Sequence, residues 1–428
     1  MLRNPNMAQF RYIEGHYFVE DVPVRQIAAA IRTPFYCYSS AAIETAYDAW
    51  ESAFAGHSVQ ICYALKANSN QSVIRLLADK GAGADVVSEG EMRRALAAGI
   101  PASKIVYGGV AKTTPEIEFA LQARIRQFNV ESEEELLQIS RAAVRLQTEA
   151  SVAFRINPDI DAGTHEKIST GKSENKFGIP WRTARAAYAR AAELPGIEVC
   201  GIDIHIGSQL MSLEPYKAAF KRVADLATDL RADGHNISTL DLGGGLGIAY
   251  DRIGEQAPTA DEYARLAIDV LSHLDCELII EPGRSLVGAA GILVASVIFV
   301  KKGSDRNFLI IDAAMNDLIR PSMYDAFHNI ASENTASREE KEYDVVGPVC
   351  ETGDTFAKAR RLPVLASGDI VVIECAGAYG SVMASTYNTR QLVPEVMVDK
   401  NTYRTIRERP GYDDMIGLDI EGGATSVA

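Results

Sequence analysis

Short apolar runs alternate with amphipathic segments between about residues 61 and 283. The runs are rich in β-branched residues and end at polar or glycine positions, a pattern that predicts buried strands. Eight such runs occur: 61–67, 84–88, 105–109, 127–130, 152–158, 199–207, 240–244 and 276–281.

The segments between these runs have the one-sided apolar spacing of helices that pack on a sheet, as at Tyr263, Leu266 and Val270. The expected helices are 71–80, 89–98, 115–123, 132–146, 183–194, 215–233 and 260–274. Consecutive strand–helix units with no reversal favour a closed, TIM-like (β/α)8 barrel, and a doubly wound open sheet is the alternative.

The pattern changes after Arg284, where helical periodicity fades. β-rich runs follow at 292–300, 308–312, 370–375 and 395–398. The fold class is therefore α/β, with a barrel over residues 36–285 and a mostly β domain over 286–428. Strand-like segments at 12–19 and 35–38 suggest that residues 1–35 add N-terminal strands to the β domain.

Composition narrows the class further. A formal net charge of −14 over 428 residues argues against a nucleic-acid or anionic-membrane partner. The longest mostly apolar run, 288–300, is shorter than the roughly 20 residues of a membrane span, and residues 1–18 lack the apolar core of an export signal. The six cysteines show no metal-ligand spacing, so we expect no metal site, and free thiols in a reducing cytoplasm.

Polar residues follow several of the predicted strands, at the end of a barrel where active sites lie. Lys66 lies inside the first run, where it is either a lysine reaching solvent or a desolvated amine of lowered pKa that forms a Schiff base with an aldehyde. His205 is either a hydrogen-bonded core residue or a ring that lies on an aromatic cofactor. The polar segment 159–176 is either a surface loop or an active-site lid.

The last two strands are followed by glycine-containing turns. Gly243, Gly244 and Gly245 could let backbone N–H groups approach a phosphate, or form a plain flexible turn. Glu281 could face a heterocyclic nitrogen, or belong to a solvated charged turn. Ser208 and the amides of Gly283 and Arg284 could add phosphate contacts.

Ten segments carry a resemblance to a known family. By them the chain resembles the alanine-racemase-like (fold type III) pyridoxal-phosphate-dependent decarboxylases, over nearly its whole length. The segments are YALKAN (63–68), ADVVSEGE (84–91), RINPD (155–159), KFGI (176–179), HIGSQ (205–209), DLGGGLGI (241–248), EPGRSLVG (281–288), DAAMNDLIRPSMY (312–324), GPVCETGD (347–354) and GAYGSVMASTYN (377–388).

The resemblance implies pyridoxal 5′-phosphate as cofactor and a role for each matching residue. Lys66 would be the Schiff-base lysine, His205 would stack on the ring, and Glu281 would pair with the ring nitrogen. The residues expected around the phosphate are Ser208, Gly243, Gly244, Gly245, Gly283, Arg284 and Tyr379.

The same resemblance implies the substrate contacts. Arg284, Arg320, Tyr324 and Tyr379 would bind substrate, with the two arginines suited to a carboxylate. Cys350 would donate a proton, and Glu351 would hold the distal amino end. The extra arginine, Arg320, together with Glu351 favours meso-2,6-diaminopimelate, converted to L-lysine and CO₂, over ornithine, arginine or carboxynorspermidine.

The implied partners are a small amino acid and a second copy of the chain, in a homodimer with shared active sites. An amino-acid racemase on a similar barrel is another possibility, as is a catalytically inactive pyridoxal-phosphate-binding regulator. The presence of Lys66 and Cys350 speaks against the regulator.

Overall fold

A computed structural model describes residues 7–160, 176–250, 256–335 and 339–419. The chain forms two compact units. Unit 1 contains Ser40–Gly291 and Gly377–Val382, and unit 2 contains Phe10–Ser39, Ile292–Ala376 and the segment that begins at Met383. The expected domain boundaries stay a prediction. The compact units differ from them because 36–39 cluster with unit 2 and 377–382 with unit 1.

Unit 1 is a closed parallel barrel. Its strands pair in sequence order, and the pairings of β13 with β5 and of β8 with β9 close the ring. The expected barrel is thus confirmed over the open sheet. The strands are β5 (Val59–Ala64), β6 (Gly83–Val86), β7 (Ile105–Tyr107), β8 (Gln127–Val130), β9 (Ala150–Asn157), β11 (Ile197–Asp203), β12 (Thr239–Asp241) and β13 (Glu277–Ile280), with the short β10 (Ile179–Pro180) beside β9.

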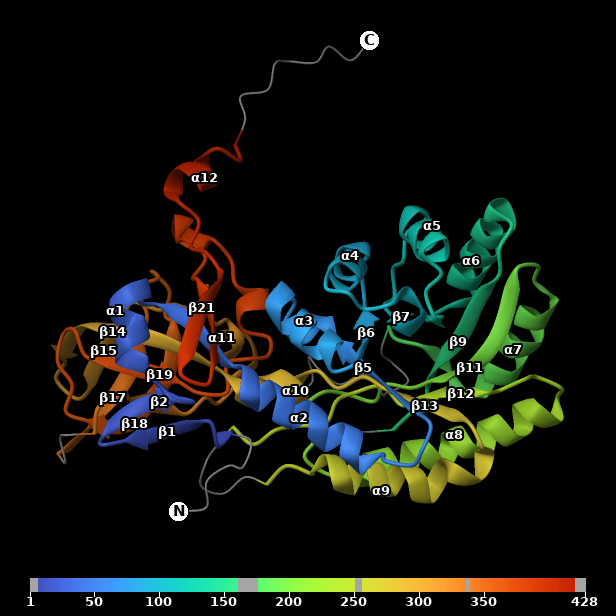
Figure 1. Ribbon diagram of the computed structural model, residues 1–428, viewed down its shortest axis with the longest axis horizontal. Helices are drawn as coiled ribbons and strands as arrows, with labels where there is room; N and C mark the ends of the chain where they lie inside the picture. Colours follow the sequence, from blue (N-terminus) through green and yellow to red (C-terminus); the bar gives the residue numbers. More distant parts are fainter. Residues whose placement is uncertain (1–6, 161–175, 251–255, 336–338, 420–428) are drawn as a thin grey trace, which may run out of the picture. The chain divides into compact units, whose positions relative to one another are not determined.

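Helices surround these strands (Figure 1). The seven expected helices are present with ends within a residue of the expectation, except that a 3₁₀ turn replaces the last from Ser272. Side-chain caps fix several starts: Ser88, Ser132 and Thr259 each accept a backbone N–H of the first turn. The helices are α2 (Ser40–Ala53), α3 (Gln71–Asp79), α4 (Glu89–Ala97), α5 (Thr114–Ala123), α6 (Glu133–Leu146), α7 (Ala184–Glu193), α8 (Glu214–Ala232), α9 (Ala260–Leu271) and α10 (Arg284–Val287).

Unit 2 is mostly β, as expected. One sheet runs in the order β18-β17-β15-β14-β4-β20-β21, with β19 paired to β14 and β16. Apolar side chains of these strands, including Tyr38, Leu293 and Val345, form its core. The strands are β4 (Phe35–Ser39), β14 (Gly291–Lys302), β15 (Asn307–Ile311), β16 (Ile330–Ser332), β17 (Glu340–Val346), β18 (Thr355–Pro363), β19 (Ile370–Ile373), β20 (Glu395–Asp399) and β21 (Thr402–Arg407).

The N-terminal strands make a smaller sheet of unit 2. The expected strand 12–19 is two strands, because the turn at Glu14 and Gly15 has positive φ and folds the chain back. This sheet contains β1 (Phe10–Ile13), β2 (His16–Val19) and β3 (Val22–Pro23). The helices of unit 2 are α1 (Val24–Ile31), α11 (Arg320–Tyr324) and α12 (Tyr412–Ile416).

Three further expectations concern membrane spans, the cysteines and the lid. No helix among the described residues has both the length and the apolar character to cross a bilayer. All six cysteines are free thiols. Most of the expected lid, residues 161–175, lies outside the described residues, so the lid stays a prediction.

Candidate active site in the barrel

Lys66 lies in a 3₁₀ turn, Leu65–Ala67, directly after β5. Strand β5 ends at Ala64, so the expectation that Lys66 lies inside the strand is wrong by two residues. Its Nζ is 2.6 Å from Oδ2 of Asp85, a β6 carboxylate that is 2% exposed. Burial alone would lower the pKa of Lys66, but Asp85 and Glu281 raise it above its ordinary value. The expected lowering of this pKa is therefore wrong, because an ion pair outweighs desolvation.

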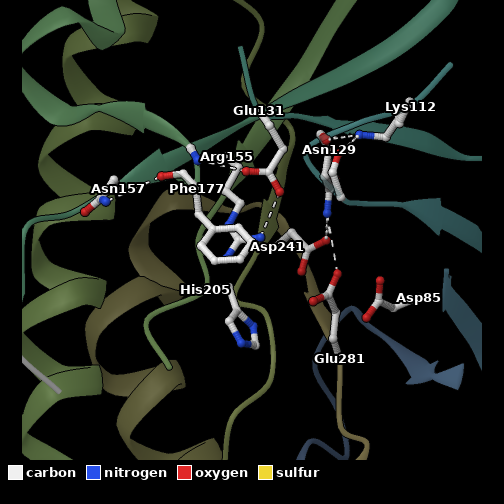
Figure 2. Close-up of polar contacts among 12 residues, drawn as sticks. Asp85, Lys112, Asn129, Glu131, Arg155, Asn157, Phe177, His205, Asp241 and Glu281 are labelled. Carbon is white, nitrogen blue, oxygen red and sulfur yellow. Dashed lines mark hydrogen bonds and ion pairs between the residues drawn. The ribbon is translucent and has the colours of Figure 1, made fainter. Parts of the chain in front are cut away.

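Glu281 follows β13 and is 7% exposed. The side-chain amide of Asn129 reaches two carboxylates, at 2.9 Å from Oδ2 of Asp241 and 3.4 Å from Oε1 of Glu281 (Figure 2). Burial, together with the charges of Asp241 and Asp85, raises the pKa of Glu281 well above its usual range. This end of the site is acidic and short of positive charge, so it suits a cationic N–H group.

His205 lies in the loop after β11, which ends earlier than the predicted run, at Asp203. The backbone N–H of Gly244 donates to Nδ1 of His205 at 3.3 Å, so the ring proton is on Nε2 and the imidazole is neutral. Burial, with the positive charges of Arg155 and Lys66, lowers the pKa of His205 well below its ordinary value. A neutral ring is suited to stacking on an aromatic cofactor.

The glycine run makes a tight turn after β12. Gly243 has φ +64°, and a Cβ there would lie 2.4 Å from the carbonyl oxygen of Ile204. Gly245 has φ +96°, and its Cβ would lie 2.2 Å from the carbonyl oxygen of Gly207, so both positions require glycine. The N–H groups of Gly243 and Gly244 donate to Asp241 and His205. The turn can bring backbone close to a ligand, but these two donors serve the protein itself.

Arg284, the first residue of α10, is surrounded by polar and aromatic side chains. Nη2 of Arg284 donates to Oγ of Ser208 at 3.1 Å, and Nη1 donates to the hydroxyl of Tyr250. The guanidinium lies 4.8 Å from the ring centroid of Tyr379, in cation–π geometry. The backbone N–H of Tyr379 donates to the carbonyl of Ala67 at 2.8 Å, next to Lys66. Gly283 immediately precedes α10, so the expected phosphate-binding residues of unit 1 gather at the same end of the barrel.

The four remaining predicted residues belong to unit 2. Arg320 and Tyr324 are the first and last residues of α11, and Arg320 is 6% exposed. Cys350 and Glu351 are exposed, in the turn between β17 and β18. Because its thiol is exposed in this chain, Cys350 is not a buried structural cysteine.

Asp354 shapes the turn that carries Cys350 and Glu351. Its carboxylate accepts the backbone N–H groups of Val349 and Met315, both at 2.7 Å, and the side chain is 2% exposed. Sequence reasoning assigned Asp354 no role. It also assigned none to five residues that contact the predicted site in unit 1: Asp85, Asn129, Asp203, Asp241 and Tyr250. Asp85 and Asp241 lie within quoted motifs, ADVVSEGE and DLGGGLGI, which was the available signal.

Fold and site together define a class. The parallel barrel carries a lysine just after its first strand. Carboxylates lie on one side of the site, and an arginine and a glycine turn lie on the other. This arrangement is that of a pyridoxal-phosphate-binding barrel. The family model described as "Pyridoxal-dependent decarboxylase, pyridoxal binding domain" matches residues 40–288.

Known proteins narrow this class further. The chain is 47% identical to diaminopimelate decarboxylase of Pseudomonas aeruginosa, over 96% of this chain and 98% of that protein. The diaminopimelate decarboxylase from M. jannaschii, in complex with L-lysine, superposes with a TM-score of 0.93 at 38% identity, covering 97% of this chain and 99% of that one. The Helicobacter pylori enzyme, also complexed with L-lysine, gives a TM-score of 0.89 at 43% identity, covering 92% and 98%. This chain belongs to the diaminopimelate decarboxylase family.

Proposed function

We propose that the chain decarboxylates meso-2,6-diaminopimelate to L-lysine and CO₂ with pyridoxal 5′-phosphate as cofactor. The observation that carries the proposal is the 47% identity with a diaminopimelate decarboxylase over almost the whole of both chains. The test is to incubate the purified protein with pyridoxal phosphate and meso-diaminopimelate, and to assay CO₂ and lysine. Higher kcat/KM on ornithine, arginine or carboxynorspermidine would replace the substrate, and racemisation without CO₂ would replace the reaction.

The residues of unit 1 fit this cofactor at both ends. Oδ1 of Asp203 is buried without a hydrogen-bond partner among the described residues, and one oxygen of each of Asp203, Asp241 and Glu281 lies within 4.8 Å of the others. A protonated ring nitrogen is the cation that such a group lacks. The cluster of Arg284 and Ser208 matches a phosphate in charge and donors. When bound, pyridoxal phosphate withdraws the electron pair that CO₂ leaves on the substrate's α-carbon.

Each residue of the barrel has a distinct task in this proposal. Lys66 would hold the cofactor covalently through its side-chain amine. His205 covers the ring face, and its neutral state avoids a second positive charge there. Glu281 keeps the ring nitrogen protonated. Arg284 and Tyr379 hold the phosphate end with Ser208, Gly245 and Gly283, and Gly243 and Gly244 shape the turn that brings backbone close to it.

The residues of unit 2 handle the substrate. Arg320 binds the distal carboxylate that the reaction retains, and Tyr324 and Arg284 assist. Glu351 holds the distal ammonium group, and the hydroxyl of Tyr387, which donates to Glu351, orients that carboxylate. Cys350 supplies a proton to the α-carbon as CO₂ departs.

Replacing Arg320 with alanine should change specificity. A charged hydrogen bond contributes about 1.5–3 kcal/mol, so kcat/KM for diaminopimelate should fall roughly tenfold to over a hundredfold. Decarboxylation of lysine, which lacks the distal carboxylate, should fall far less. Arg361→Ala, which removes a surface arginine of the same unit, should change neither rate. Equal losses on both substrates would mean that Arg320 supports the fold.

We also propose a cytoplasmic homodimer with shared sites. Ser322 of α11 donates to the carbonyl of Gly353, so the Cys350 turn and α11 form one surface. Met323 of α11 exposes 40% of its area, and Phe327, just after this helix, exposes 47%. Exposed apolar side chains around exposed catalytic residues suit a two-fold interface that completes the site.

Mixing two inactive variants tests the shared site. Lys66→Ala and Cys350→Ala subunits should regain partial activity when mixed, because a mixed dimer contains one site with both residues intact. Subunit exchange is confirmed separately with differently tagged chains. Proven exchange without regained activity would mean that each site is built within one chain, and would leave the proposed reaction untouched.

A further inference from the structure

Three buried carboxyl groups meet in the interior of the barrel. Asp203 ends β11, Asp241 ends β12 and Glu281 follows β13, so three neighbouring strands deliver them to one place. Their side chains are 2%, 1% and 7% exposed, and one oxygen of each lies within 4.8 Å of the others. We call these three residues the carboxyl cluster. Its charge is held in a region of low dielectric, where like charges repel strongly.

The hydrogen bonds to the carboxyl cluster are unequal. Asp241 accepts from the amide of Asn129 at 2.9 Å and from the N–H of Gly243 at 3.1 Å. Glu281 accepts the longer bond of 3.4 Å from Asn129 and shares a side-chain hydrogen bond with Asp241, whereas Oδ1 of Asp203 receives none among the described residues. Hydrogen bonds of this kind favour the charged form of a carboxyl group, so Asp241 is the member best able to be ionised.

The amide of Asn129 is itself held in place. The ammonium group of Lys112 donates to the backbone carbonyl of Asn129 at 2.8 Å (Figure 2). It also donates to Glu135 at 2.6 Å. Gln127 donates to the amide oxygen of Asn129 at 2.6 Å, which fixes the amide nitrogen toward the carboxyl cluster. These contacts hold the side-chain amide of Asn129, a neutral donor, in place to donate to both Asp241 and Glu281.

The cations near the cluster are already matched. Lys66 pairs with Asp85 at 2.6 Å, and Arg155 pairs with Glu131 at 2.9 Å. The titratable and charged groups that face the cluster from the surrounding elements are Cys62, Lys66, Asp85, Glu131, Arg155, His205 and Tyr263. The two cations among these groups, Lys66 and Arg155, are balanced by two carboxylates. The described residues around the cluster therefore have no spare positive charge to neutralise three ionised carboxylates in it.

Three carboxyl groups in this position do not all ionise near neutral pH. Burial raises the pKa of Asp241 to about 6. Burial, and next the charge of Asp241, raises the pKa values of Asp203 and Glu281 well above their ordinary range. The cluster therefore retains at least one proton at neutral pH.

We propose that Asp203 and Asp241 are positioning residues for the cofactor's ring nitrogen, and that with Glu281 they store the proton which that nitrogen carries. The proton leaves a carboxyl oxygen of the cluster and bonds to the nitrogen, so one carboxyl group becomes a carboxylate and no proton is taken from solution. The resulting N–H cation supplies the positive charge that the cluster lacks. This inference rests on the proposed function only in placing the ring nitrogen beside Glu281.

The carboxyl cluster, which no cation among the described residues neutralises, should lower the stability of the cofactor-free protein. Asp203→Asn removes one ionisable group and adds an amide donor, so it should raise the melting temperature of the full-length apoprotein by roughly 2–4 °C. The same change should weaken pyridoxal-phosphate binding at least tenfold, measured by titrating the apoprotein and following its fluorescence. Neither readout depends on decarboxylation, so a failure here is separable from a failure of the proposed function.

The pH dependence gives a second, independent readout. A carboxyl group whose pKa is raised on folding stabilises the protein most when it is protonated. Its contribution is complete below its unfolded-state pKa of about 4, and it is lost as the pH rises through the folded-state pKa. The apoprotein should therefore lose stability between about pH 4 and neutral pH. In Asp203→Asn this slope should be smaller by about one proton.

A matched control separates storage of a proton from ordinary packing. Glu374 of unit 2 is 1% exposed, and its carboxylate accepts from Tyr17 at 2.6 Å and Asn329 at 2.9 Å. Glu374→Gln should lower the melting temperature and leave pyridoxal-phosphate affinity unchanged. If Asp203→Asn behaves like this control, Asp203 is a structural residue of the barrel and the proposal fails.

Two further measurements keep the test decisive. If Asp203→Asn does not fold, Asp241→Asn is measured instead, and it must weaken pyridoxal-phosphate binding at least tenfold. Manganese ions alone are also added to the apoprotein, because three carboxylates can hold a metal. A saturable rise in melting temperature with manganese, lost in the variants, would identify a metal site and overturn the proposal.

Discussion

Replacing Lys66 with alanine is expected to lower turnover by roughly 10⁴–10⁶-fold, the range found when an enzyme loses a covalent nucleophile or its partner. The variant retains Asp85 and Glu281, so the barrel keeps its acidic end but lacks the amine that holds the cofactor. In the unmodified protein, borohydride should fix pyridoxal phosphate on the peptide that contains Lys66. Peptide mass spectrometry of the reduced protein gives the position directly.

A second lysine provides the control for this experiment. Lys80 also pairs with an aspartate, with its Nζ 2.5 Å from Oδ1 of Asp48, but it lies outside the proposed site. Lys80→Ala should retain near-normal turnover. Added small primary amines should restore part of the activity of Lys66→Ala, because they replace the missing side-chain amine. They would restore no activity if the variant were misfolded. A borohydride label on Lys112 or any other lysine would show that the site assignment is wrong.

Replacing Cys350 with alanine should lower turnover by roughly 10²–10⁴-fold, the usual contribution of a positioned general acid. The α-carbon that loses CO₂ must gain a proton, and Lys66 can reach only the side set by its tether. Cys350 is exposed in a turn ordered by Asp354, and thiols are ordinarily protonated near neutral pH. A proton that arrives at the cofactor's own carbon instead would convert pyridoxal phosphate to its amine form.

The spectrum distinguishes this role from a structural one. Cys350→Ala should bind pyridoxal phosphate normally and then accumulate the amine form of the cofactor during turnover, seen as a loss of absorbance in the visible region. Cys200→Ala is the control, because that thiol lies in β11 of unit 1 and has no role in the proposed site. Near-normal turnover without cofactor conversion would exclude Cys350 as the proton donor.

The sequence was a good guide where periodicity reports burial. The barrel strands are buried on both faces, so their apolar runs were visible, and the helices between them were equally regular. The strands β17 and β18 were missed. Glu340–Val346 begins with three exposed residues, and Thr355–Pro363 is the edge strand of its sheet and contains Lys358, Arg360 and Arg361. Strands that are solvated along much of their length give no apolar run to detect.

Sequence motifs gave candidate site residues at one end of the barrel, but they could not give the electrostatics there. Motifs pointed to Lys66, His205 and Glu281, each of which lies at the expected end of the barrel. The pKa of Lys66 depends on Asp85, nineteen positions further along the chain, and on the register that places them 2.6 Å apart. The carboxyl cluster depends on three strands that are remote in sequence. Such distances follow from barrel closure, which local sequence does not report.

The return of residues 377–382 to unit 1 has a consequence for synthesis on the ribosome. Asn68 donates to the carbonyl of Gly377 at 3.2 Å, and a Cβ at Gly377 would lie 1.9 Å from the carbonyl oxygen of Val287, so this segment packs tightly on the barrel. A nascent chain that has released only residues 40–288 has every barrel strand but not Tyr379. The proposed cofactor site would therefore be completed only after most of unit 2 has emerged, and a gene cut at the end of the barrel would encode a site without Tyr379.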